Sequence, residues 1–314
     1  MFRIEQVELS SFLNFSILLC VIISVIGISS KENGKFLRDL NAFLSIYLIA
    51  SFSLAVYEHI TLKHLPLSAS YLVTTIWDGY YHAPSGFFTN QNDFALVFVM
   101  ATMFKLSYLK KGKKNHLINW LLIIMCLWIT HVTGSRLNLM GFIIFLAFYF
   151  RFWELKKLLL IGISSIIIIS FFSYIFVNSS FSLKGHSTNT RINLYYQALL
   201  SIPESYGVGY GIDLSKNFYQ DRPSNAGISN FINPHSYIFE LLINSGILTF
   251  IVYLSLYALI LRKAIVFKTR LDIFIQLILY NLLLFSSSSS LFLWPHYFFF
   301  VVYINYEFLK PKDD

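Results

Sequence analysis

The chain has 314 residues, of which 56% are hydrophobic, 18% aromatic and only 13% charged, and its mean hydropathy is +0.62. Soluble domains carry about 25% charged residues, so this composition excludes a soluble protein and indicates a single integral membrane domain over residues 1–314. The formal net charge of +8 does not indicate binding to nucleic acid, because Lys and Arg occur in short clusters between apolar runs.

Membrane-spanning helices are predicted where about 17–20 mostly apolar residues follow one another, because that length crosses the bilayer core. In chain order the candidates are 11–29, 42–57, 93–109, 117–133, 137–152, 158–177, 236–261, 272–288 and 291–309. The predicted fold is therefore all-α, a polytopic bundle of about nine transmembrane helices. Both cysteines, Cys20 and Cys126, lie inside these runs, which indicates small buried residues rather than a disulfide or a metal pair.

Basic residues predict how the helices are oriented. One set of loops and the C-terminus contain 17 of the 24 Lys and Arg residues, in the clusters at 31–38, 105–114, 151–157, 262–270 and 310–312. Cytoplasmic loops carry such an excess, so the C-terminus is predicted to be cytoplasmic and the N-terminus to be outside. An odd number of spans with an outer N-terminus also suggests that further N-terminal helices are missing from this sequence.

Two long loops then face outward, at 58–92 and 178–235. The second lies between the sixth and seventh predicted helices and is too long for an ordinary structureless connection. It contains "TRINLYYQALLSIPE" at 190–204, whose apolar residues have helical spacing, and the glycine cluster "GVGYG" at 207–211. We therefore expect a large, ordered extracytoplasmic loop domain on the outer membrane face.

Three residues of this outer face are candidates for chemistry. Arg136 lies between two helices that have almost no loop between them, Arg191 opens the helical stretch of the large loop, and His235 directly precedes the seventh span. Arginine binds phosphate oxygens through a planar fork, and histidine transfers protons near neutral pH. Together they suit a lipid diphosphate substrate. The alternatives are an arginine extending to lipid headgroups, a solvated surface charge, and a histidine that merely precedes a helix.

Other polar features are interpreted differently. "GVGYG" has no preceding strand and no following Lys-Ser/Thr, so turn glycines are favoured over a phosphate-binding loop. The outer acidic residues are scattered, so no divalent metal site is expected. Glu240 lies just over one turn into the seventh span, where it either orients an outer arginine or is buried against a neighbouring helix.

Four stretches, in this order, resemble the bacterial O-antigen ligase and polysaccharide repeat-unit polymerase superfamily of GT-C type membrane glycosyltransferases. They are "GFFTNQNDFA" (86–95), "TGSRLNLMGF" (133–142), "TRINLYYQALLSIPESYGVGYG" (190–211) and "NPHSYIFELLINSG" (233–246). The resemblance covers about residues 86–261. This sequence has Ser236 where the family usually has asparagine after the histidine, and Asn244 where an acidic residue is common.

The resemblance implies a site and a function. The family's two arginines and its histidine correspond to Arg136, Arg191 and His235, the expected catalytic residues. Arg222, Glu240 and Tyr195 are the further residues expected to bind substrate. Such proteins are taken to work without a metal or other cofactor, with arginines holding an undecaprenyl diphosphate and the histidine serving the acceptor hydroxyl or the phosphate.

The expected function is polymerisation of undecaprenyl-diphosphate-linked oligosaccharide repeat units, for O-antigen or capsular polysaccharide, at the outer face of the inner membrane. The nearest alternative is a ligase that transfers the glycan to lipid A core, protein or a wall polymer. More distant alternatives are a transporter of the same lipid and a non-catalytic assembly subunit. The expected partners are the lipid-linked oligosaccharide, the bilayer, and chain-length regulator and flippase proteins, with no nucleic acid.

Overall fold

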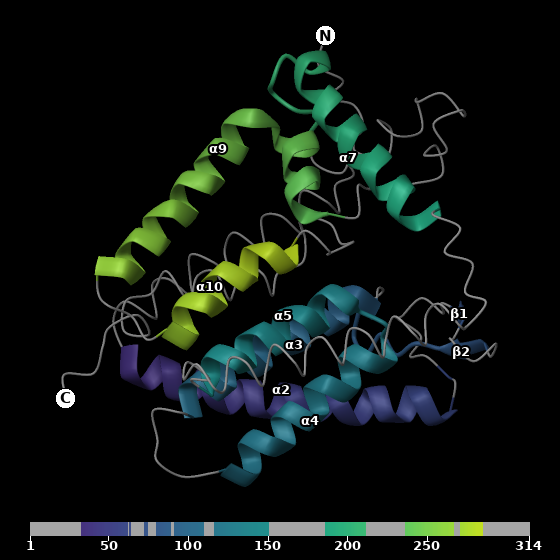
Figure 1. Cartoon of the computed structure of the whole chain (residues 1–314), viewed down its shortest axis with the longest axis vertical. Helices are drawn as coiled ribbons and strands as arrows, with labels where there is room; N and C mark the ends of the chain where they lie inside the picture. Colours follow the sequence, from purple (N-terminus) through teal and green to yellow (C-terminus); the bar gives the residue numbers. More distant parts are fainter. Residues whose placement is uncertain are drawn as a thin grey trace, which may run out of the picture. The chain divides into compact units, whose positions relative to one another are not determined.

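The computed structural model describes residues 33–61, 63, 72–74, 80–88, 91–109, 116–150, 186–211, 236–266 and 271–284. The chain divides into two compact units (Figure 1). The first unit comprises Met1–Phe43 and Ser187–Asp314, and the second unit comprises Leu44–His186.

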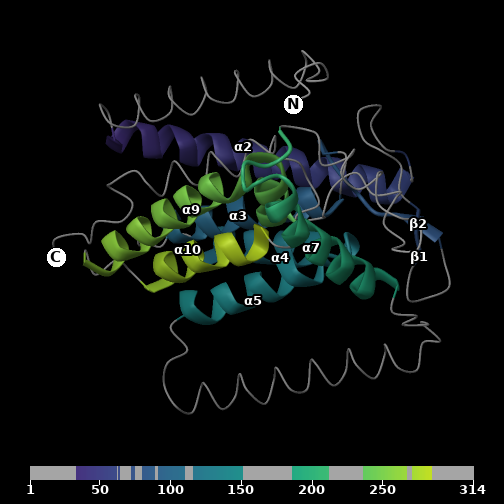
Figure 2. The ribbon, with the colours of Figure 1, turned by 90° about the horizontal axis from the view of Figure 1, so that it is seen from above.

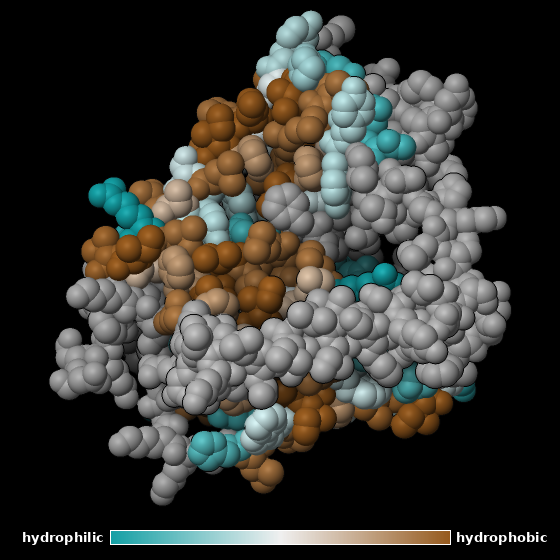
Figure 3. All heavy atoms as spheres, viewed as in Figure 1, coloured by the Kyte–Doolittle hydropathy of each residue, from teal (hydrophilic) through white to brown (hydrophobic). Residues whose placement is uncertain are grey.

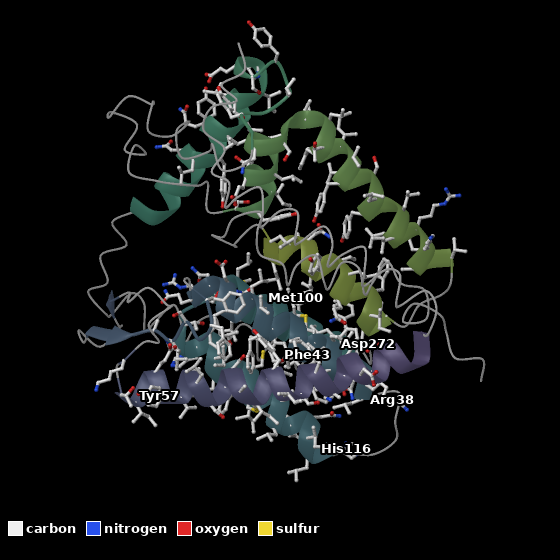
Figure 4. All side chains as sticks on the ribbon, turned by 180° about the vertical axis from the view of Figure 1, so that it is seen from behind. Arg38, Phe43, Tyr57, Met100, His116 and Asp272 are labelled. Carbon is white, nitrogen blue, oxygen red and sulfur yellow. The ribbon has the colours of Figure 1, made fainter. Side chains whose placement is uncertain are left out.

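The second unit is built around α3 (Gln91–Leu109), which packs against both α4 (His116–Val132) and α5 (Arg136–Tyr149). Every residue of α3 from Asp93 to Ser107 is buried. Its sequence explains this burial, because apolar residues lie on all sides of the helix and none of its faces suits water. Met100 accordingly lies among the packed helices, whereas Tyr57 projects from the surface (Figure 4).

Helix α2 (Asn33–Thr61) presents one side to this packing. Its buried residues recur every three or four positions, at Leu44, Leu48, Ser51, Ala55 and Glu58. Aromatic contacts tie its C-terminal half to α4, because the Trp128 ring lies 5.3 Å from that of Phe52 and 5.5 Å from that of His59. The intervening positions expose Ile46, Ile49 and Ile60, as expected for a helix with one side toward lipid.

The predicted outer loop 58–92 contains a short sheet. Strand β1 (Leu72–Thr74) pairs antiparallel with β2 (Tyr80–His82), with Leu72 opposite His82. This pair is the one departure from the predicted all-α fold among the described residues. The rest of the described secondary structure is helical.

The first unit contains α7 (His186–Glu204), α9 (Tyr237–Val266) and α10 (Leu271–Leu284). Helices α9 and α10 are held together by two tyrosines of α9. The Tyr253 hydroxyl donates to Asn281 Oδ1 at 2.5 Å, and the Tyr257 hydroxyl donates to the carbonyl of Leu277 at 3.0 Å. Helix α7 confirms the helix predicted at 190–204.

Helix α9 is not continuous, because Gly246 has φ 75° and ψ −179° and divides it into two segments (Figures 1 and 2). The first segment is mostly buried, whereas the second exposes a series of aliphatic side chains, among them Leu248, Ile251 and Leu259 (Figure 3). Residues 247–266 provide about 30 Å of helix, which is the thickness of the hydrocarbon core. The second segment therefore suits a lipid environment.

Three described helical segments are long and apolar enough to cross a membrane: Arg38–Thr61, Gln91–Leu109 and Tyr237–Val266. Helices α4, α5 and α10 are apolar but shorter. Helices thus occur at six of the nine predicted spans. The predicted spans 11–29, 158–177 and 291–309 lie outside the described residues, as does most of the predicted loop 178–235.

Candidate functional site

The glycine cluster at 207–211 is bound to the break in α9 through main-chain hydrogen bonds. The amides of Tyr210 and Gly211 donate to the carbonyls of Ile243 and Asn244 at 2.8 and 2.9 Å, and the Ile247 amide donates to the Gly207 carbonyl at 2.9 Å. A helix break leaves such groups without their intrahelical partners. The loop supplies those partners, and we call this arrangement the glycine clasp (residues 207–211 with 243–247).

Glycine is required at both sides of the clasp for a steric reason. A Cβ on Gly209 would lie 2.5 Å from the Gly246 nitrogen and 2.8 Å from the Asn244 carbonyl oxygen. A Cβ on Gly246 would in turn collide with the main chain of Gly207 and Val208. Gly207, Gly209 and Gly211 all have positive φ, which confirms the interpretation of "GVGYG" as turn glycines.

Side-chain packing extends this contact along α7 and the first segment of α9. Leu194 and Ala198 of α7 are fully buried in a cluster with Ile243 of α9. Packed against this cluster, the rings of Tyr195 and Phe239 stack 4.4 Å apart at an interplanar angle of 16°. Such a pair contributes about 0.5–1.5 kcal/mol beyond its buried area.

The order of these contacts shows that the two segments run in the same direction. Tyr195 faces Phe239, and further along both segments Gly207 bonds to Ile247. The starts of α7 and α9 therefore lie at the same end of this contact, as Figures 1 and 2 show. In the sequence of α7, Arg191 precedes Tyr195 by four residues. His235 and Arg222 lie outside the described residues.

The start of α9 contains buried polar residues. Ser236, which immediately follows His235 in the sequence, is buried, and its carbonyl accepts the hydrogen bond from the Glu240 amide at 2.9 Å. Glu240 is 4% exposed in the first turn, and this burial is compatible with both roles considered for it. Asn244 is also buried, next to the glycine clasp. The segment that begins directly after His235 therefore carries three buried polar side chains, those of Ser236, Glu240 and Asn244.

Arg136 is the first residue of α5 and is exposed. The turn Thr133–Ser135 joins α4 to α5, so the predicted near-absence of a loop is confirmed. The Ser135 side chain makes no capping bond to the helix; its Oγ instead accepts from Asn138 Nδ2 at 2.8 Å. A guanidinium at the positive end of a helix dipole favours a bound anion such as phosphate.

The predicted site residues therefore fall into two groups. Within the first unit, the structure places the ring of Tyr195 against Phe239 in the first segment of α9, which also carries Glu240. Arg136 lies in the second unit. Among the described residues, no three His, Cys, Asp or Glu side chains cluster as metal ligands would.

Sequence reasoning missed Phe239 as the stacking partner of Tyr195 and Gly246 as the point where α9 breaks. Asn-Ser-Gly at 244–246, inside an apolar run, was an available signal, because such residues often interrupt helices.

Comparison with known proteins adds to this geometry. Residues 118–254 match the protein family described as O-Antigen ligase, and this segment contains most of α4, all of α5 and α7, and the clasp. Over 222 residues the chain is 28% identical to the teichuronic acid biosynthesis protein TuaE of Bacillus subtilis strain 168. That alignment covers 64% of this chain and 44% of TuaE, so the chain spans less than half of that relative. By this match and this relative, the chain is similar to the O-antigen ligase and polysaccharide polymerase superfamily of membrane proteins.

Proposed function

We propose that this protein polymerises undecaprenyl-diphosphate-linked oligosaccharide repeat units on the outer face of the plasma membrane. The superfamily and the relative in teichuronic acid biosynthesis support polysaccharide assembly as the general process. We add to this general process the identity of the carrier lipid, the identity of the acceptor, and the polymerase reaction.

The observation that carries the proposal is the stacked pair Tyr195–Phe239 above the glycine clasp. The pair holds the middle of α7 beside the first turn of α9. Arg191 precedes Tyr195 by four residues and His235 precedes Phe239 by four residues. We therefore assign the phosphate-binding side chain to α7 and the proton-accepting side chain to the stretch of sequence that leads into α9.

In the proposed reaction, the acceptor hydroxyl attacks the anomeric carbon of the donor sugar. The bond from that carbon to the phosphate oxygen breaks, and the lipid diphosphate leaves with the electron pair. His235 accepts the hydroxyl proton, while Arg136 and Arg191 stabilise the charge that develops on the leaving diphosphate. The donor is already activated, so orientation of the acceptor and charge stabilisation are the main tasks of the protein.

Ligation to a different acceptor is the second candidate, because the matching family is itself described as O-Antigen ligase. The two reactions share the donor and the leaving group and differ in the acceptor. The same residues serve both, so the acceptor alone has to be identified.

Deletion of the gene, followed by electrophoresis of the surface polysaccharide, distinguishes the two. Loss of a polymerase leaves material with a single repeat, whereas loss of a ligase leaves full-length chains on the carrier lipid. Membranes containing the protein should convert purified lipid-linked repeat units to longer chains, and an excess of EDTA should not stop them. An unchanged polysaccharide after deletion would contradict both candidates.

A further inference from the structure

Glu58 is a buried carboxylate near the end of α2 that binds a neighbouring loop. Its side chain is fully buried, and its Oε2 accepts hydrogen bonds from the amides of Ser85 and Gly86, both at 2.9 Å. An ionised carboxylate is costly to bury unless it is hydrogen-bonded, so these two bonds tie residues 85–86 firmly to α2. The same loop begins the stretch 86–95 that leads into α3.

The loop is in turn packed against the first turn of α3. Gly86 has φ +55°, and a Cβ on it would lie 2.9 Å from the ring of Phe94. The amide of Phe88 donates to the Ser85 carbonyl at 2.9 Å and closes a turn, and the Phe88 ring lies 6.3 Å from that of Phe94. Residues 85–88 therefore pack directly against the first turn of α3.

That turn of α3 is bonded to the first turn of α5. Asn138 Nδ2 donates both to the Asn92 carbonyl at 3.3 Å and to Ser135 Oγ at 2.8 Å. Asn138 and Ser135 are both buried, and between them in the chain stands the exposed Arg136. The side-chain amide of Asn138 thus connects the start of α5, which carries Arg136, to the start of α3, which packs against residues 85–88.

We propose that Glu58 is a positioning residue for Arg136, acting through residues 85–88, the first turn of α3, and Asn138. This inference rests on the proposed function only for the role of Arg136 in binding substrate. The contacts that lead from Glu58 to Arg136 all lie within the second unit. A bidentate contact to a diphosphate requires the guanidinium to be placed within a fraction of an ångström, and a small displacement costs about 10²-fold in rate.

Amide hydrogen exchange of the full chain in detergent tests the connection without reference to activity. In Glu58→Ala, exchange should rise both in residues 85–88 and in residues 133–140. Glu58→Gln retains an oxygen that can accept the same two amides, so it should exchange like the wild type. Leu48→Ala is the matched control: Leu48 is on the same buried face of α2 and does not contact the loop through a hydrogen bond, so its effect should not reach 133–140.

The activity measurement uses lipid-linked repeat units as the probe. Glu58→Ala should lower kcat/KM by about 10–100-fold, and Glu58→Gln should restore it to within about threefold of the wild type. In an Arg136→Lys background the further loss from Glu58→Ala should be much smaller, because residues that act through one another are not additive. Asn138→Ala breaks the same connection at its other end and provides the test if Glu58→Ala does not accumulate in membranes.

The outcomes separate this inference from the proposed function. Unchanged exchange at 133–140 in both Glu58→Ala and Asn138→Ala overturns the inference, whatever the activity. Equal losses from Glu58→Ala in the wild-type and Arg136→Lys backgrounds also overturn it, because they indicate general destabilisation. Raised exchange at 133–140 together with a fully active Arg136→Lys enzyme supports the structural connection and rejects the proposed role of Arg136.

Discussion

Gly209 and Gly246 approach so closely that a Cβ on Gly209 would lie 2.5 Å from the Gly246 backbone nitrogen. Two stretches far apart in the sequence are thereby joined through their main chains. The break in α9 is stabilised by the glycine loop. The loop forms hydrogen bonds with the carbonyls of Ile243 and Asn244 and with the amide of Ile247, which the break leaves without partners inside the helix.

Gly209→Ala should open the clasp. The added methyl group meets backbone rather than a flexible side chain, and the residue has φ +86°. Gly134→Ala is the matched control, because Gly134 has φ +64° with nothing within 4 Å of its Cβ position and should cost only the backbone strain of about 1–2 kcal/mol. The apparent Tm in detergent should fall by several degrees more for Gly209→Ala. Equal Tm values for the two variants would contradict the clasp.

The stacked pair should matter for activity through ring geometry. Phe239→Tyr retains the stacking on Tyr195 and should stay active, whereas Phe239→Leu removes about 0.5–1.5 kcal/mol of ring interaction and loosens the start of α9. Chain-length distributions from membranes of equal protein content provide the measurement. We expect shorter chains from Phe239→Leu; identical distributions from both variants would show that the pair is dispensable.

Arg136→Lys should lose most activity although the positive charge is kept, because lysine cannot form the bidentate contact with a diphosphate. Arg262→Lys, at an exposed arginine in the last turns of α9, is the control and should behave like the wild type. Synthesis of lipid-linked polymer is measured at equal abundance in membranes. Normal chain lengths from Arg136→Lys would indicate that this arginine interacts only with lipid headgroups.

His235 is tested by two substitutions that separate its possible roles. If it accepts the proton, His235→Ala should slow turnover by about 10²–10⁴-fold, and His235→Gln should be nearly as slow, because an amide cannot accept a proton. Retained activity in His235→Gln would instead indicate hydrogen bonding to phosphate or sugar. His131→Ala, at an exposed histidine of α4, is the control. A normal rate in His235→Ala would leave the residue without a catalytic role.

Reporter fusions test the predicted orientation. Fusions after Ser179 and Lys216 should report an extracytoplasmic location, and fusions after Lys113 and Lys268 a cytoplasmic one, because 17 of the 24 basic residues fall on the second side. A cytoplasmic signal from the 178–235 loop would place Arg191 and His235 on the side opposite to the proposed chemistry.

Hydrophobic patterning alone determined much of the helical architecture. The apolar runs predicted α3, α4, α5 and α10, since a segment of that composition can satisfy its backbone in lipid only as a helix. The amphipathic spacing at 190–204 predicted α7, and the absence of a strand before "GVGYG" correctly indicated turn glycines. Such properties reside in neighbouring residues, so the sequence is sufficient to reveal them.

The tertiary structure decided which of these segments bind one another. Asn-Ser-Gly in an apolar run indicates where a helix can break, but the sequence does not show that Gly209 packs against the break at Gly246. Likewise, the sequence shows Glu58 only as an acidic residue near the end of a predicted span. Its role in holding residues 85–86 becomes visible only from the hydrogen bonds that the amides of Ser85 and Gly86 donate to it. Local patterns encode helices through short-range periodicity, whereas main-chain contacts between distant segments depend on packing that no local pattern specifies.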